Sequence, residues 1–195
     1  MLREGDQTLI ALGSNEKSVW GDARKTVQKA MLLVAKLSRD VPLMSGFFVT
    51  KAFPAGSGPD YVNAAIAIKT DLKPPALLAA LHEIEAEAGR KRARRWGQRT
   101  LDLDLIAMGD CVLPDATTHR EWRDLSLADQ QRLTPDDLIL PHPRLQDRAF
   151  VLMPLLDIAP DWHHPLLQRS IAQLCADLPG DLRAEVTRLS DPAPL

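Results

Sequence analysis

The sequence predicts an α+β fold: a ferredoxin-like split βαβ core with helices packed on a mainly antiparallel sheet, followed by a loop-rich C-terminal half. The apolar patterns of the first half occur in the order strand, helix, strand, strand, helix, strand. Leucine and aspartate alternate from Leu101 to Leu105, which is the period of a strand. Ten of the fifteen prolines follow residue 109, so we expect the second half to hold only short helices, near 150–156 and 167–178.

The first strand and helix follow from short local signals. Residues 8–12 are an apolar run that predicts a buried strand, and Gly13-Ser14-Asn15 predicts a turn after it. Asp22 is a residue type that caps helix N-termini. Apolar residues then recur at helical spacing, at Ala23, Val27, Ala30, Met31, Val34 and Leu37.

Two more strands and a helix complete the predicted core before the last strand. Residues 43–53 and 61–68 are rich in apolar residues and predict strands, separated by a glycine- and proline-containing loop. Pro74-Pro75 predicts a helix start, and Gly89 predicts the helix end. The 36 residues between Asp104 and Pro141 form a long connection, whose part from about 109 to 137 is an excursion without an assigned function. We expect the tail, 190–195, to be frayed.

Composition limits the class of protein. The 195 residues suit one domain, 1–195, and 45% hydrophobic with 26% charged residues excludes wholesale disorder. A net charge of −2 argues against a generally basic nucleic-acid binder. Cys111 and Cys175 have no CxxC partner, which favours a reduced, cytoplasmic location over a disulfide or zinc scaffold. We find neither a membrane-spanning run nor a signal peptide and expect no membrane partner.

Asp102 and Asp104 form the first candidate site. Residues i and i+2 of a strand point to one face, so the two carboxylates share a side while the leucines bury the other. Carboxylates this close repel unless a cation compensates them, and Mg²⁺ held by carboxylates and substrate phosphates is the natural partner. The alternative is an amphipathic edge strand with a solvated acidic face.

A cluster of basic residues precedes the aspartates. The segment from Gly89 to Arg99 holds six basic side chains and no acidic one, namely Arg90, Lys91, Arg92, Arg94, Arg95 and Arg99. Arginine forks match phosphate oxygens, so a polyphosphate with Mg²⁺ explains the cluster and the aspartates together. The alternatives are a solvated loop for the basic run, and ordinary packing rather than a lid for Trp96.

A stiff segment with a histidine is the third candidate. Prolines flank His142, and Arg148 follows. The prolines restrict the backbone, which suits a histidine that hydrogen-bonds a phosphate while Arg148 pairs with one. Taken alone, the segment is better explained by a surface turn.

Four motifs in order resemble the 6-hydroxymethyl-7,8-dihydropterin pyrophosphokinase family, over roughly residues 8 to 165. They are Ile10 to Asn15, Pro59 to Ala65, Arg95 to Asp104, and Leu140 to Pro143 continued by Arg148, Phe150 and Pro154-Leu155. The chain departs from the family pattern at Lys51, His82, Gln98 and Ile139. The connection between Asp104 and Pro141 is also longer than in compact members.

The resemblance implies transfer of pyrophosphate from ATP to the hydroxymethyl oxygen of the reduced pterin, with release of AMP, in folate biosynthesis. It implies that Asp102 and Asp104 hold two Mg²⁺ ions and act in catalysis with Arg95 and Arg99. Its ATP-binding positions are Glu85, Arg90, Arg92, His142 and Arg148. Its pterin positions are Thr50, Phe53, Tyr61, Asn63, Trp96 and Phe150. We expect a monomer that binds no nucleic acid.

Two other functions remain open from the residues. A metal-dependent nucleotidyltransferase also uses paired aspartates with basic residues, and it would release pyrophosphate instead of AMP. A non-enzymatic RNA-binding module would use the arginine cluster and would bind RNA in a salt-sensitive way, but it leaves Asp102 and Asp104 unexplained.

Overall fold

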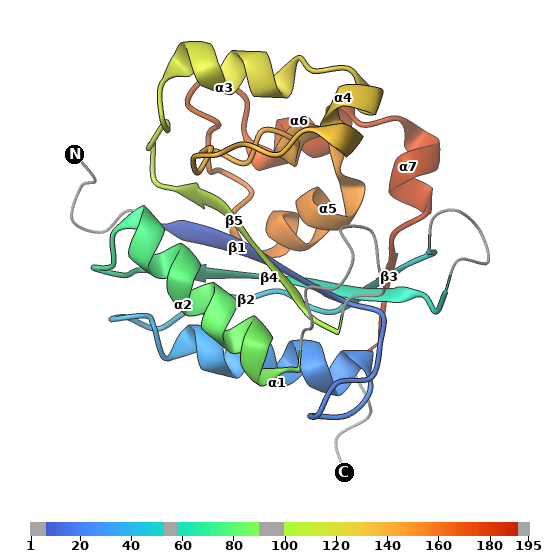
Figure 1. Ribbon diagram of the computed structural model, residues 1–195. Helices are drawn as coiled ribbons and strands as arrows, with labels where there is room; N and C mark the ends of the chain where they lie inside the picture. The colour runs from blue at the N-terminus through green and yellow to red at the C-terminus, as the bar shows by residue number, and fades with distance from the viewer. Residues whose placement is uncertain (1–6, 53–57, 90–99, 191–195) are drawn as a thin grey trace.

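The computed structural model describes residues 7–52, 58–89 and 100–190, which form an antiparallel sheet between two helical layers (Figure 1). The strands are β1 (Thr8–Ser14), β2 (Leu43–Met44), β3 (Phe48–Thr50), β4 (Tyr61–Ile68), β5 (Asp102–Met108) and β6 (Thr187–Arg188). The helices are α1 (Ala23–Ala35), α2 (Pro74–Glu87), α3 (Ala116–Arg123), α4 (Leu127–Arg132), α5 (Ala149–Ile158), α6 (Ile171–Asp177) and α7 (Gly180–Ala184), with a 3₁₀ turn at Leu145–Asp147.

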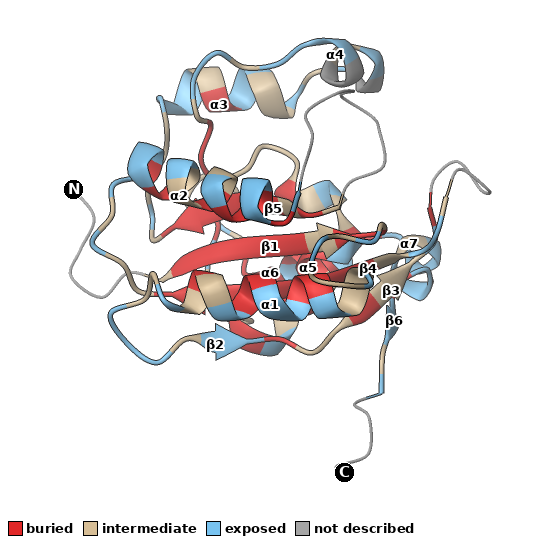
Figure 2. Cartoon of the chain, turned by 60° about the horizontal axis from the view of Figure 1, so that its bottom comes forward, coloured by how far each residue is buried: buried red, intermediate tan, exposed pale blue. Residues whose placement is uncertain are grey.

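The strand order confirms the predicted ferredoxin-like core. The sheet runs β5-β1-β4-β3-β6, β2 also pairs with β4, and every pairing is antiparallel. The two strands joined by the first helix are therefore separated by β4, which is the split arrangement. β1 is central and is buried along almost its whole length (Figure 2).

Helices α1 and α2 cover one face of the sheet. The Asp22 side chain accepts from the N–H of Lys25 at 2.9 Å, which confirms it as the helix cap. At the end of α2, Gly89 has φ +85°, a conformation that favours glycine, so it terminates the helix as predicted. Buried aliphatic residues join both helices to the sheet, including Val27, Val34, Leu77, Leu81, Leu103 and Leu105.

The opposite face is covered by α5, with α6 and α7 beyond it (Figure 1). The predicted short helices near 150–156 and 167–178 correspond to α5 and α6. Ser170 caps the N-terminus of α6: its side chain accepts from the N–H of Gln173, while the Gln173 side chain accepts from the N–H of Ser170. Leu152 and Leu155 are fully buried between α5 and the sheet.

Two local predictions need correction, and one short strand was not predicted. Gly13 and Ser14 are the last two residues of β1 rather than a turn. The strand predicted over 43–53 is broken into β2 and β3, and residue 53 lies outside the described residues. At the break, the Ser45 hydroxyl, rather than a backbone carbonyl, accepts from the N–H of Ala65 on β4 at 2.8 Å. β6, an exposed strand of two residues paired with β3, was not predicted.

The excursion after β5 carries α3 and α4, which lie above the sheet in Figure 1 and beyond its β5 edge in Figure 2. Leu113, at its start, pairs through backbone hydrogen bonds of 2.9 and 3.1 Å with Leu140, which follows it. Cys111 and Cys175 are free thiols, as expected. Within the described ranges, no helix has the length and apolar character needed to cross a membrane.

Candidate active site

Asp102 and Asp104 lie on the α5 face of β5, as the alternation predicted. Both side chains are half-buried, whereas Leu101, Leu103 and Leu105 between and around them are buried against α1 and α2. The carboxylates therefore share one accessible face at an edge of the described sheet, and the hydrophobic effect on the other face holds them there.

The neighbouring strands place small residues beside the carboxylates. Gly13 lies opposite both Asp102 on β5 and Asn63 on β4, and Ala11 lies opposite Asp104. Directly opposed residues of an antiparallel ladder point to the same face, so Gly13 and Ala11 separate the two aspartates from Asn63. A Cβ atom added at Gly13 would come within 3.3 Å of the Asn63 Oδ1 atom, so even a methyl group is crowded there.

Gly13 and Ala11 form a strip of small residues, and the amide of Asn63 and the hydroxyl of Thr50 lie on the side of this strip away from the aspartates. The Asn63 Nδ2 atom donates to the Thr50 Oγ1 atom at 3.0 Å, which fixes the orientation of an amide that is only 4% exposed. Tyr61 lies opposite Thr50 and two residues before Asn63, so it shares their face. Three of the predicted pterin positions are thus brought together by β3 and β4.

Arg148 lies beside the carboxylates at the start of α5. Its Nη1 atom is 3.6 Å from the Asp104 Oδ2 atom, and both side chains are about one-third exposed, at 31% and 32%. The same guanidinium lies over the Phe150 ring, 5.8 Å from the ring centre, and Phe150 is exposed. This end of α5 therefore brings one cation and one aromatic ring to the aspartate face.

His142 is held at the β5 edge of the described sheet. Its backbone N–H donates to the Ile106 carbonyl at 2.7 Å, and its Nδ1 atom accepts from the N–H of Arg144 at 3.1 Å. Because Nδ1 accepts, the proton of the neutral ring is on Nε2. Desolvation and the nearby charges of Arg148 and Arg144 lower the pKa of His142 to about 3, although Asp102 acts in the opposite direction. The ring is therefore a neutral hydrogen-bond donor at physiological pH.

Glu85 supports β5 from α2, the helix layer on the other face of the sheet. It is only 2% exposed, and its Oε1 atom accepts from the N–H of Leu103 at 2.8 Å. Leu103 lies between the two aspartates, so this carboxylate satisfies a backbone group of an edge strand at the site. The predicted contact of Glu85 with ATP stays a prediction.

Ser14 and Asn15 have positioning contacts that the residue-by-residue interpretation missed. The Ser14 hydroxyl donates to the Thr100 carbonyl at 2.6 Å, and the Asn15 Nδ2 atom donates to the Pro59 carbonyl at 3.3 Å. They tie the end of β1 to the residues just before β5 and β4. Both residues belong to the Ile10–Asn15 motif of the resemblance. Taken alone, however, Gly13-Ser14-Asn15 predicts only a turn and does not indicate which distant groups its side chains bind.

Several predicted site residues lie outside the described residues, so their roles stay predictions. They are Phe53, Arg90, Arg92, Arg95, Trp96 and Arg99. Of the predicted residues that the structure describes, all but Glu85 lie on the α5 face of the sheet or at its β5 edge, and Glu85 reaches β5 from the opposite face.

The carboxylate pair has the chemistry of a Mg²⁺ site completed by a substrate. Its donors are oxygens on one face with a neighbouring cation that suits an anionic ligand. Among the described residues, no group of three or more His, Cys, Asp or Glu side chains is placed to hold a metal ion alone. Two carboxylates thus fit a hard cation that takes its other ligands from substrate phosphates and water.

This antiparallel α+β fold, with paired carboxylates, an arginine and a neutral histidine on one edge, has the features of a metal-dependent phosphotransferase. The model of the 7,8-dihydro-6-hydroxymethylpterin-pyrophosphokinase family matches residues 9–160. The chain belongs to this family.

Curated relatives agree with the family match. A Synechocystis protein named 2-amino-4-hydroxy-6-hydroxymethyldihydropteridine pyrophosphokinase is 37% identical over 166 residues, which cover 85% of this chain and 73% of the relative. A Haemophilus influenzae protein of the same name is 36% identical over 153 residues, covering 78% of this chain and 81% of the relative.

Solved structures show the same fold. Wild-type HPPK-DHPS from Plasmodium falciparum superposes with a TM-score of 0.57 at 12% identity, covering 88% of this chain and 44% of that chain. The present chain thus spans less than half of that longer protein, and the similarity bears on the fold alone.

Proposed function

We propose that this chain transfers pyrophosphate from ATP to the hydroxymethyl group of 6-hydroxymethyl-7,8-dihydropterin and releases AMP, the step of folate biosynthesis for which its family is named. One observation supports placing this reaction on the α5 face of the sheet. A single sheet face presents Asp102 and Asp104 on one side and the Thr50–Asn63 pair on the other. Carboxylates for a metal-bound polyphosphate and a fixed amide for a planar heterocycle are the two halves that this reaction requires.

Asp102 and Asp104 are proposed to hold the magnesium, with two ions implied by the resemblance. When bound, Mg²⁺ neutralises charge on the phosphoryl group being transferred. The position of Arg148, 3.6 Å from Asp104, supports a role in holding a phosphate once a cation compensates the carboxylates.

His142 is proposed to donate a hydrogen bond from Nε2 to a phosphate oxygen of ATP. The tautomer supports this role: because Nδ1 accepts from the N–H of Arg144, the Nε2 atom carries the proton and can donate it. Arg90, Arg92, Arg95 and Arg99 are proposed, from the resemblance, to bind or orient the same phosphates, and Glu85 to lie near the nucleotide.

The pterin is proposed to lie on the side of the strip formed by Thr50, Tyr61 and Asn63. The Asn63 amide offers both a donor and an acceptor to a ring edge, and Phe150 is an exposed aromatic surface for stacking. Phe53 and Trp96 join this set from the resemblance. Attack of the hydroxymethyl oxygen on the β-phosphorus forms a new P–O bond and breaks the bond from that phosphorus to the oxygen shared with the α-phosphorus. That oxygen leaves with AMP, and the hydroxyl proton passes to solvent.

The protein is proposed to act as a single domain, a monomer, in the cytoplasm, without a nucleic-acid or membrane partner. The two free thiols support a reducing location.

Product analysis tests the proposal. The protein is incubated with Mg²⁺ and ATP, with and without the hydroxymethyl-dihydropterin, and the nucleotide products are separated. AMP formed only with the pterin, in equal amount to pterin diphosphate, is the expected result. Release of pyrophosphate would favour the nucleotidyltransferase, and ADP or no turnover would refute the proposed reaction.

A further inference from the structure

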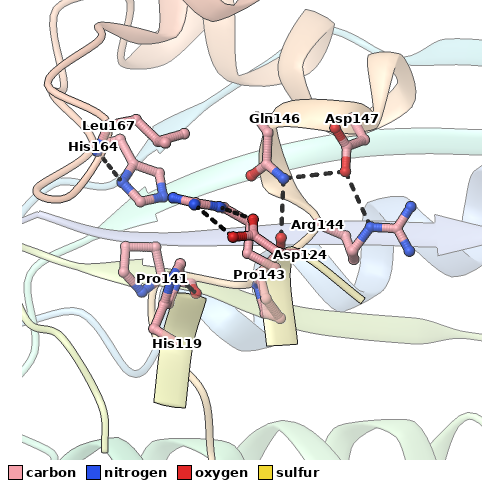
Figure 3. A network of polar contacts seen from close by, with 10 residues as sticks. His119, Asp124, Pro141, Pro143, Arg144, Gln146, Asp147, His164 and Leu167 are labelled. Carbon is pink, nitrogen blue, oxygen red and sulfur yellow. Dashed lines mark hydrogen bonds and ion pairs between the residues drawn. The ribbon is translucent and has the colours of Figure 1, made fainter. Parts of the chain in front are cut away.

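The excursion after β5 makes a buried polar contact with the segment that carries His142. His119, on α3, is fully buried, and its Nε2 atom lies 2.8 Å from the Pro141 carbonyl oxygen. Figure 3 shows the two residues side by side, with His164 nearby. The contact joins positions 22 residues apart and gives this excursion a direct connection to the candidate active site.

The Pro141–His142 peptide unit is bound at both of its polar groups. Its carbonyl accepts from His119 on α3, and its N–H donates to the Ile106 carbonyl on β5 at 2.7 Å. A planar peptide held at both ends has its orientation fixed. That orientation sets the direction in which the His142 side chain leaves the backbone.

His119 is in the protonation state that this contact requires. A carbonyl oxygen only accepts, so the Nε2 atom of His119 carries the proton. Burial, the largest influence, lowers the pKa of His119, which favours the neutral ring. The ring also packs edge-on against His164, with 5.7 Å between ring centres, and His164 is itself fixed by the N–H groups of Leu166 and Leu167. The donor is therefore rigidly placed.

We propose that His119 is a positioning residue for ATP, which acts through the Pro141 carbonyl to aim the Nε2–H of His142. The inference rests on the proposed role of His142 in binding ATP. It gives the excursion, residues 109–137, a function in the reaction. The Pro141–His142 peptide is held on one side by β5 and on the other by α3.

The test compares two substitutions of His119 in the full chain. His119→Gln keeps an amide N–H at the end of the side chain, whereas His119→Leu keeps bulk and removes the donor. We expect His119→Leu to raise KM for ATP about tenfold with KM for the pterin unchanged, and His119→Gln to restore most of the affinity.

Asp115→Ala is the matched control. Asp115 caps α3: its carboxylate accepts from the N–H groups of Thr117 and Thr118 and from the Thr118 hydroxyl, all within the first turn of the helix. Loss of the cap weakens the same helix without removing the His119 donor. We expect its KM for ATP to stay within about twofold of wild type.

A double substitution separates this inference from the proposed function. If His119 acts through His142, His119→Leu has no further effect on KM for ATP in a His142→Ala background. Additive effects of the two changes, or equal effects of His119→Leu and Asp115→Ala, would overturn the inference. A wild-type KM for ATP in His142→Ala itself would instead refute the proposed role of His142, and the inference with it.

Discussion

Glu85 provides the sharpest test of how α2 supports the aspartate strand. Its carboxylate accepts from the buried N–H of Leu103 at 2.8 Å, between Asp102 and Asp104. Glu85→Gln removes the charge but keeps a carbonyl oxygen that can accept the same bond. Glu85→Leu removes the charge and the acceptor, and it leaves the N–H without a partner while filling most of the volume.

Both variants remove the charge, so the difference between them reports whether an acceptor remains for the Leu103 N–H. A buried N–H without an acceptor costs about 1–3 kcal/mol, so Glu85→Leu is expected to unfold with a free energy lower than that of Glu85→Gln by about 2 kcal/mol. For a chain of this length, that difference corresponds to a Tm lower by roughly 4–8 °C.

Urea unfolding at pH 7, followed by circular dichroism, measures this difference, and an unchanged slope against urea shows that the unfolded state is comparable. Glu83, which is exposed on the same helix, provides the control. Glu83→Gln and Glu83→Leu are expected to agree within about 0.5 kcal/mol. Equal stability of the two Glu85 variants would refute the support of β5 by this carboxylate.

Three further substitutions test the rest of the site and fold. Gly13→Ala is expected to raise KM for the pterin, because its methyl group would lie 3.3 Å from the Asn63 Oδ1 atom. Its circular dichroism spectrum is expected to stay unchanged. An unaltered KM for the pterin would argue against pterin binding beside Gly13. Thr50→Val is expected to raise KM for the pterin about tenfold without changing KM for ATP, since Asn63 loses its 3.0 Å partner; equal effects on both substrates would contradict it. Burial lowers the pKa of His164 from 6.5 to about 4, so the folded state resists protonation and stability falls as the pH drops from about 6.5 toward 4. Between pH 7 and 5, protonation of this group lowers the free energy of unfolding by about 2 kcal/mol. His164→Asn is expected to flatten the dependence of the unfolding free energy on pH, and an unchanged dependence would contradict this reasoning.

Patterns with a short sequence period predicted most of the fold. The alternation of Leu and Asp in β5 follows from burial of one face of the strand, and it does not depend on the position of the strand in the sheet. Asp22 and Gly89 mark the helix ends because capping depends on a few neighbouring residues. These features could therefore be predicted from the sequence without knowing the tertiary structure.

Features that depend on distant partners were missed. At the strand break, the hydroxyl of Ser45 accepts from the N–H of Ala65 on β4, and β6 pairs with β3 from the far end of the chain. The buried contact of His119 with Pro141 likewise joins a helix of the excursion to a segment that no local pattern connects with it. Glu85 was predicted from the resemblance as a nucleotide neighbour, and its hydrogen bond to β5 needed the packed structure.

The turnover number of aspartate variants tests the central claim most directly. Asp102→Asn and Asp104→Asn preserve side-chain size and remove a carboxylate that is proposed to hold Mg²⁺. Asp110→Asn, at an exposed position beyond the other end of β5, is the control. We expect kcat for AMP formation at saturating Mg²⁺ to fall about 100-fold or more in the two site variants and to be unchanged in the control, with all three chains folded. Wild-type turnover in either Asp102→Asn or Asp104→Asn would contradict the assignment of this carboxylate pair as the metal site.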